Sequence, residues 1–110
     1  MSVVKALALS PKDNVATAVA NIEANTKVTV KIGKETMEIL VKEPIQFGHK
    51  FALRRIKAGE EVIKYGEVIG RATKDIEPGC HVHIHNVESI RGKVELIRKK
   101  LEEEEKKRGG

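Results

Sequence analysis

Gly79-Cys80-His81-Val82-His83-Ile84-His85-Asn86 holds three of the four histidines of this 110-residue chain, in strict alternation with apolar residues. Alternation on a β-branched background predicts a β-strand. Successive side chains of a strand point to opposite faces, so we expect the three imidazoles on one face and Val82 and Ile84 on the other. One side of this strand is therefore predicted to pack in a core and the other to carry polar chemistry.

The rise of a strand limits which of these imidazoles can act together. Side chains two positions apart start about 6.6 Å from each other, close enough for two rings to converge on one ion. His81 and His85 start about 13 Å apart, too far to share an ion unless the strand bends. The expected pair is therefore His83 with His85, while Cys80 belongs to the Val82 face. Half-exposed histidines that face solvent or a subunit boundary fit the same spacing equally well.

Composition indicates a single globular domain with a strongly charged surface, since 40% of the residues are hydrophobic and 34% are charged. One cysteine excludes an internal disulfide and fits a reducing compartment. No apolar run approaches the roughly 18 residues needed to cross a bilayer, and the N-terminal run reads as a strand rather than a signal. We therefore expect a cytoplasmic protein without a membrane partner.

The formal net charge of +5 raises the alternative of nucleic-acid binding. Aromatic residues make up only 3% of the chain, which leaves little for bases to stack on. Basic residues are also interleaved with acidic ones, a pattern shared by heat-adapted surfaces. We expect no nucleic-acid partner.

The remaining sequence predicts a mainly β protein with two helices. A turn over residues 10–14, where Asp13 or Asn14 can cap a helix, precedes residues 15–22, whose apolar side chains recur at helical spacing. After residue 92 a narrow apolar stripe among Lys, Arg and Glu predicts a charged C-terminal helix and tail. Further strands are expected over residues 4–9, 26–32, 36–41 and, as two short strands or one kinked strand, 62–70.

Three short segments share one pattern, a turn followed by two polar-type positions and then a valine that opens a strand. They cover residues 24–28, 58–62 and 78–82. Short strands separated by such turns are typical of compact β folds with a closed or partly closed sheet.

A second stretch of interest, Ile45-Gln46-Phe47-Gly48-His49-Lys50-Phe51-Ala52-Leu53, centres on a glycine. Gly48 tolerates a positive φ and allows close approach to the backbone. His49 and Lys50 follow it, between the two phenylalanines of the chain. Polar groups on an apolar frame are typical of a binding loop, while a tight turn with solvated side chains is the alternative.

Several of these stretches together resemble a known family. They are, in chain order, Ala6-Leu7 with Pro11-Lys12-Asp13-Asn14-Val15-Ala16, Phe47-Gly48-His49-Lys50-Phe51-Ala52-Leu53, residues 56–59, Tyr65-Gly66-Glu67-Val68-Ile69-Gly70, and Val82-His83-Ile84-His85-Asn86 with Glu88-Ser89 and Arg91-Gly92. In these stretches the chain resembles the N-terminal SAF-type domain of the altronate dehydratase and galactarate dehydratase family, which has a β-clip fold. The resemblance covers about residues 5–92, with departures at Asn25 and Gln46. It implies a SAF-type β-clip domain over residues 1–92, followed by a charged helix and tail over residues 93–110.

The resemblance also implies a function. Family members dehydrate sugar acids such as altronate or galactarate, and some carry this domain as a separate small subunit. We therefore expect the small subunit of a sugar-acid dehydratase, a hydro-lyase that is inactive without its large catalytic subunit. Assembly of several copies of this chain into a homo-oligomer is also compatible with the sequence. The alternatives are the small subunit of a sulfolactate sulfo-lyase and a non-catalytic module that binds sugars or carboxylates. A divalent metal, iron(II) in most members, is the expected cofactor, bound either by this chain or only with the large subunit.

Dehydration of a sugar acid needs a base, a group that stabilises the carboxylate as charge develops, and an acid for the departing hydroxyl. Imidazole titrates near neutral pH, so we expect catalytic roles for His49, His83 and His85. Lys50 is expected to pair with the substrate carboxylate. Asn86 is expected to bind a substrate hydroxyl or, alternatively, to cap the end of the strand. His83 and His85 are the expected metal ligands.

Overall fold

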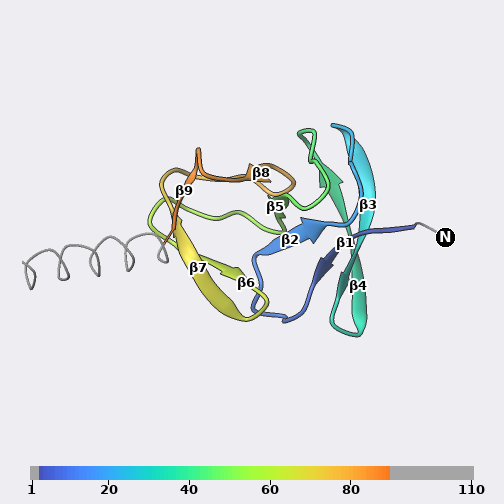
Figure 1. Ribbon diagram of the computed structural model, residues 1–110, viewed down its shortest axis with the longest axis horizontal. Helices are drawn as coiled ribbons and strands as arrows, with labels where there is room; N and C mark the ends of the chain where they lie inside the picture. The colour runs from blue at the N-terminus through green and yellow to red at the C-terminus, as the bar shows by residue number, and fades with distance from the viewer. Residues whose placement is uncertain (1–2, 90–110) are drawn as a thin grey trace, which may run out of the picture.

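The computed structural model describes residues 3–89, which form nine β-strands and no helix (Figure 1). A six-stranded sheet has the order β4-β3-β1-β2-β5-β8, and a three-stranded sheet has the order β6-β7-β9. The prediction of a mainly β fold is confirmed for this part of the chain. No helix long and apolar enough to cross a membrane occurs among these residues. The strands are β1 (Val4–Ala8), β2 (Val15–Ala18), β3 (Thr26–Ile32), β4 (Glu35–Val41), β5 (Lys50–Ala52), β6 (Glu61–Lys64), β7 (Glu67–Ala72), β8 (His81–Val82) and β9 (Val87–Ser89).

Strand β3 coincides with the strand predicted over residues 26–32, and β4 is its predicted return. Val28 and Val30 are buried while Lys27 and Lys31 are exposed. The alternation of apolar and polar residues in the sequence therefore matches a strand with one buried and one solvated face. The region 62–70 forms two strands, β6 and β7, as one of its two interpretations expected. The charged helix predicted over residues 93–110 lies outside the described residues.

The helix predicted over residues 15–22 is wrong, because Val15–Ala18 form β2 in the middle of the large sheet. Val15 packs in one hydrophobic core, whereas Ala16 and Ala18 pack in the other. A strand covered on both faces has a continuous apolar run, which periodicity cannot separate from a short buried helix. The small alanine side chains fit this position between two cores.

Two cores share a wall made of β2 and β5. Val15 lies opposite Ala52 and contributes with it to the core that includes Val82, while Ala16 lies opposite Phe51 in the core of the large sheet. In Figure 1 these two strands lie between the β3–β4 hairpin and the β6–β7 hairpin. The wall positions the loop before β5, which carries His49.

Four turns are built on the same plan, with a buried isoleucine three residues before a residue of positive φ. The isoleucines pair through β-bridges, Ile22 with Ile45 and Ile56 with Ile76. The positive φ falls on Asn25, Gly48, Gly59 and Gly79. The repeat seen in the sequence is confirmed as turns that lead into strands, and it extends to residues 47–51, where Phe51 takes the place of valine.

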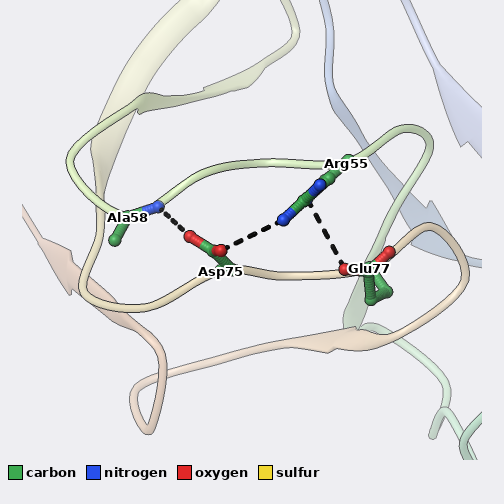
Figure 2. Close-up of polar contacts among 4 residues, drawn as sticks. All are labelled: Arg55, Ala58, Asp75 and Glu77. Carbon is green, nitrogen blue, oxygen red and sulfur yellow. Dashed lines mark hydrogen bonds and ion pairs between the residues drawn. The ribbon is translucent and has the colours of Figure 1, made fainter.

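The second pair of these turns is also joined by polar side chains. Asp75 accepts the N–H of Ala58 at 2.8 Å and a guanidinium N–H of Arg55 at 3.2 Å, and Arg55 contacts Glu77 at 3.5 Å. The Ala58 N–H, followed by Arg55, lowers the pKa of Asp75 below its ordinary value. Figure 2 shows the two loops side by side, with Arg55 directed from one toward the two acidic residues of the other. Exposed ion pairs contribute little stability each, so the contacts of Asp75 and Glu77 with the neighbouring loop chiefly fix how the two loops lie against each other.

Asp13 and Asn14, which we expected at a helix start, instead tie the β6–β7 hairpin to the large sheet. Both side chains are buried. The Asp13 carboxylate accepts the N–H of Gly66 at 2.7 Å. The Asn14 amide donates to the Glu61 carbonyl at 2.8 Å and accepts the Ile63 N–H at 2.8 Å. The two side chains therefore satisfy hairpin backbone groups from across the molecule.

Asp13→Asn is expected to destabilise the protein by about 1–3 kcal/mol at neutral pH, because the new amide NH₂ would face backbone donors. Burial raises the pKa of Asp13, but the N–H groups of Gly66, Leu9 and Ser10 bring it below its ordinary value of 3.8. A group with a depressed pKa contributes stability above its unfolded pKa and loses it as the pH falls through the folded one. In urea unfolding, the difference between wild type and variant should shrink toward about pH 3. A difference independent of pH would contradict this role.

Gly79→Ala is expected to destabilise the protein more than the matched variant Gly59→Ala. Both positions have positive φ, of 82° and 89°, which costs an alanine about 1–2 kcal/mol. A Cβ at residue 79 would also collide with the main-chain carbonyl of Leu40, whereas none lies within 4 Å at residue 59. Urea unfolding should show an additional loss of about 1–3 kcal/mol for Gly79→Ala. Equal losses for the two variants would argue against the close packing of this turn on β4.

Candidate functional site

The site is assembled by antiparallel pairing of β5 with β8, in which Lys50 lies opposite Val82 and Phe51 opposite His81. Extending this register by one residue places His49 opposite His83. Residues that face each other across an antiparallel pair share one side of the sheet. The pairing therefore gathers His49, His81 and His83 on one side and leaves Lys50 on the other.

The three imidazoles form a stacked cluster. The ring centroids of His49 and His83 are 4.8 Å apart, those of His49 and His81 5.1 Å, and those of His81 and His83 5.3 Å. The interplanar angles are 11–18°, so the rings are nearly parallel. His49 Nδ1 lies 3.0 Å from His81 Nε2, so one of these nitrogens carries the proton that the other accepts.

The continuous strand expected over residues 81–86 is wrong, because β8 ends at Val82 and residues 83–86 form a turn. The turn brings His85 back toward His81, with ring centroids 5.4 Å apart and tilted by 39°. This is the bend under which these two residues were expected to approach. Ile84, expected on the core face, is 85% exposed instead. Val82 is fully buried and Cys80 packs against its core, as predicted.

Asn86 determines this turn. Its side chain is buried, its Oδ1 accepts the His83 N–H at 2.9 Å, and its Nδ2 donates to the His81 carbonyl at 2.8 Å. The Asn86 N–H also donates to the His83 carbonyl at 3.1 Å. These contacts match the capping alternative for Asn86, while a role in binding substrate stays a prediction.

Beside the cluster lies an open hollow of about 610 Å³. Lys50 and His83 both line it, so the two faces of the β5–β8 pair meet at His83. Its walls are mainly apolar, with Glu67 as the acidic residue among them. The full lining consists of Lys50, Glu67, Val68, Ile69, Val82, His83, Ile84, Val87 and Ser89.

Burial and neighbouring charges favour the neutral forms of the basic groups here. Partial burial, followed by the effect of His49, lowers the pKa of both His81 and His83, and Lys50 lowers that of His83 further. Burial and then Lys64 lower the pKa of Lys50. A neutral imidazole has a free lone pair, so these rings are suited to accept a proton or to bind a metal ion.

Sequence reasoning placed His49, Lys50 and His83 in one site. The structure brings the rings of His49 and His83 into contact, and it places Lys50 with His83 at the hollow, on the other face of the β5–β8 pair from His49. It missed His81 as a close neighbour of His49, although the shared turn pattern around Gly48 and Gly79 was a usable signal. It also missed Glu67 and Ser89, which reach the hollow from β7 and β9. Both lie in stretches that carry the family resemblance, but nothing in those stretches indicated that they reach the hollow.

Fold and site together define a mainly β domain with an imidazole cluster beside a hollow that contains Lys50. The chain belongs to the altronate/galactarate dehydratase SAF domain family, whose sequence profile matches residues 4–90. The resemblance recognised from the sequence motifs is thereby confirmed.

Individual relatives fall into two groups. The chain is 45% identical to the altronate dehydratase of Escherichia coli K12 over 74 residues, which are 67% of this chain and 14% of that enzyme. It is 41% identical to the (2R)-sulfolactate sulfo-lyase subunit alpha of Chromohalobacter salexigens over 75 residues, which are 66% of this chain and 80% of that subunit. The chain therefore matches a small part of the first protein and most of the second.

Asn86→Ala is expected to cost about 1–3 kcal/mol of stability, because it leaves the His83 N–H and the His81 carbonyl without their partner. Urea unfolding measures this loss, and the amide NMR signals of His81 and His83 should shift with it. The matched control is His85→Ala, an exposed change in the same turn, for which we expect a change within about 0.5 kcal/mol. If both variants were equally stable, Asn86 would not be what holds the turn.

Proposed function

We propose that this chain is the SAF subunit of a sugar-acid hydro-lyase of the altronate or galactarate type, with an active site completed by a larger polypeptide. The observation that carries the proposal is the position of His83, which belongs to the imidazole cluster and also lines the hollow that contains Lys50. The proposed proton carrier and the proposed binding group for the substrate carboxylate thus line one hollow.

The chemistry of elimination gives these groups distinct roles. Lys50 offers a cation within an apolar hollow, where its attraction for a substrate carboxylate is stronger than in water. His83 and His49 are the proposed proton carriers. Burial and then His49 lower the pKa of His83, and when protonated this ring is a good donor to a departing hydroxyl. His85 is exposed, so its proposed catalytic role needs the surface that a larger polypeptide would add.

Exposed apolar side chains next to the cluster support completion by a partner. Ile84, between His83 and His85, is 85% exposed, and Phe47, two residues before His49, is 68% exposed. Large apolar residues exposed beside a polar site are typical of surfaces that another polypeptide covers. The names and lengths of the relatives agree with this, since one group consists of longer enzymes and the other of subunits.

The family resemblance also implies a divalent metal, iron(II) being the expected one, with His83 and His85 as expected ligands. The donor chemistry of the cluster fits such an ion, since imidazole is a ligand for iron and its neighbours in the periodic table. When bound, the ion supplies Lewis-acid stabilisation of negative charge on the substrate. Lys50 and the imidazoles not engaged in binding it would still position the carboxylate and move the proton.

A sulfo-lyase subunit is the second candidate function. The observation that favours it is the coverage of the sulfolactate sulfo-lyase alpha subunit, 80% of which is matched by this chain. The same hollow would then hold a substrate that loses a sulfonate group rather than a hydroxyl. A non-catalytic module that binds carboxylates is the remaining alternative.

The test is a complex of this chain with the large lyase subunit of the same organism, assayed with altronate, galactarate and (2R)-sulfolactate. Lys50→Met and His83→Ala are each expected to lower kcat/KM by about 10²–10⁴-fold, because each removes a group that contacts the reacting substrate. The matched control is Lys34→Met, an exposed change in the β3–β4 turn, which should leave kcat/KM unchanged.

The preferred substrate separates the two lyase functions. Near-normal turnover by both site variants would reject the proposed roles. Substrate binding by the complex without turnover of any of the three acids would favour the binding module.

A further inference from the structure

We propose that His49, His81 and His83 form a three-imidazole site that binds one first-row transition-metal dication on this chain alone. This ligand set differs from the pair expected from spacing, because it includes His81 and His49 in place of His85. His81 also lies outside the stretch that carries the family resemblance. With an ion bound, His49 and His83 would act as ligands, so among the imidazoles proposed for catalysis His85 would be left to carry the proton.

The positions of the ring nitrogens carry the proposal. One nitrogen from each of the three rings lies within 4.8 Å of the other two. Three nitrogens bound to one tetrahedral ion at about 2.0–2.1 Å lie about 3.3 Å from each other. His49 Nδ1 and His81 Nε2 are 3.0 Å apart, close to this spacing, and the ion would take the place of the proton between them. Binding requires these two rings to turn toward the ion and His83 to approach by rotation about its side-chain bonds.

The backbone that carries the ligands is held in place by hydrogen bonds. The His49 N–H donates to Gln46 at 2.9 Å, and its carbonyl accepts the Ala18 N–H at 2.8 Å. The His81 carbonyl and the His83 N–H are both held by the Asn86 side chain. Ion binding therefore orders three rings without folding a loop, which reduces its entropic cost.

The donor set selects the kind of ion. Among the described residues, the group consists of three imidazoles without a carboxylate or thiolate. Such a set suits Zn²⁺, Co²⁺, Ni²⁺, Cu²⁺ and Fe²⁺, whereas Mg²⁺ and Ca²⁺ require oxygen ligands. The half-buried rings leave the remaining coordination positions open to water or a substrate oxygen, as in catalytic rather than structural sites.

Charge around the cluster agrees with this choice. The Glu43 carboxylate accepts the main-chain N–H of His81 at 3.2 Å, and its negative charge would offset part of the positive charge of the bound ion. Lys50 opposes it from the other face of the β5–β8 pair.

The experiment uses the full chain without its partner, freed of metal with a chelator and of any purification tag. Titration with Co²⁺, followed by visible absorption, and with Zn²⁺, followed by calorimetry, should show one ion bound per chain. His49→Ala, His81→Ala and His83→Ala are each expected to weaken binding by about 100-fold or more, because each removes a ligand. His85→Ala separates the two ligand sets, because the pair expected from spacing needs His85; for the three-imidazole site it should change the dissociation constant by less than about twofold.

Circular dichroism and urea unfolding check that each variant is folded. Asn86→Ala provides a second route, since it keeps all the imidazoles but removes the side chain that holds the backbone of His81 and His83, and it should therefore weaken binding. No binding by the wild-type chain would overturn the proposal. Loss of binding in His85→Ala with retention in His81→Ala would also overturn it and favour the pair expected from spacing. Because affinity is measured on the chain alone, failure here leaves the lyase function untouched, and an inactive complex leaves the metal site untouched.

Discussion

The register between β5 and β8 is the constraint on which the rest of the site depends. The two strands share only two paired positions, yet Phe51 and Val82 are both fully buried and belong to different cores. A slip by one residue would exchange the faces, placing Lys50 in a core and Phe51 outside it. Backbone bonds beyond the strand ends, from Ala52 to Cys80 and from Gly79 to Ala52, extend the same register. Burial thus fixes which histidine lies opposite which.

Sequence patterns predicted those parts of the fold that depend on local alternation. Residues 26–32 alternate cleanly because one face of β3 is buried and the other solvated. Residues 15–22 were wrongly predicted as a helix because β2 is covered on both faces, so its apolar residues do not alternate with polar ones as they do in a half-exposed strand. The histidine stretch misled for a different reason, since its bend depends on the side chain of Asn86, which bonds to backbone groups three and five residues earlier.

The candidate site shows the same limit. The residue types at 49, 50 and 83 indicated chemistry correctly, because imidazole and ammonium groups beside glycine turns are typical of binding loops. The nearness of His49 to His81 was not predictable from spacing, because it depends on pairing across 32 residues of chain. Glu67 and Ser89 enter the hollow from a separate sheet, which the Asp13 and Asn14 bonds hold against the first.

A single domain appears in relatives of very different length, as a small part of an altronate dehydratase and as most of a sulfo-lyase subunit. The structure offers a physical reason in that the hollow is open and its rim includes the exposed Ile84. The central claim is that β5 and β8 bring His49 face to face with His81 and His83. The most direct test is a nuclear Overhauser experiment on the metal-free chain labelled at histidine. We predict cross-peaks from the ring protons of His49 to those of both His81 and His83, and their absence in the folded chain would contradict the claim.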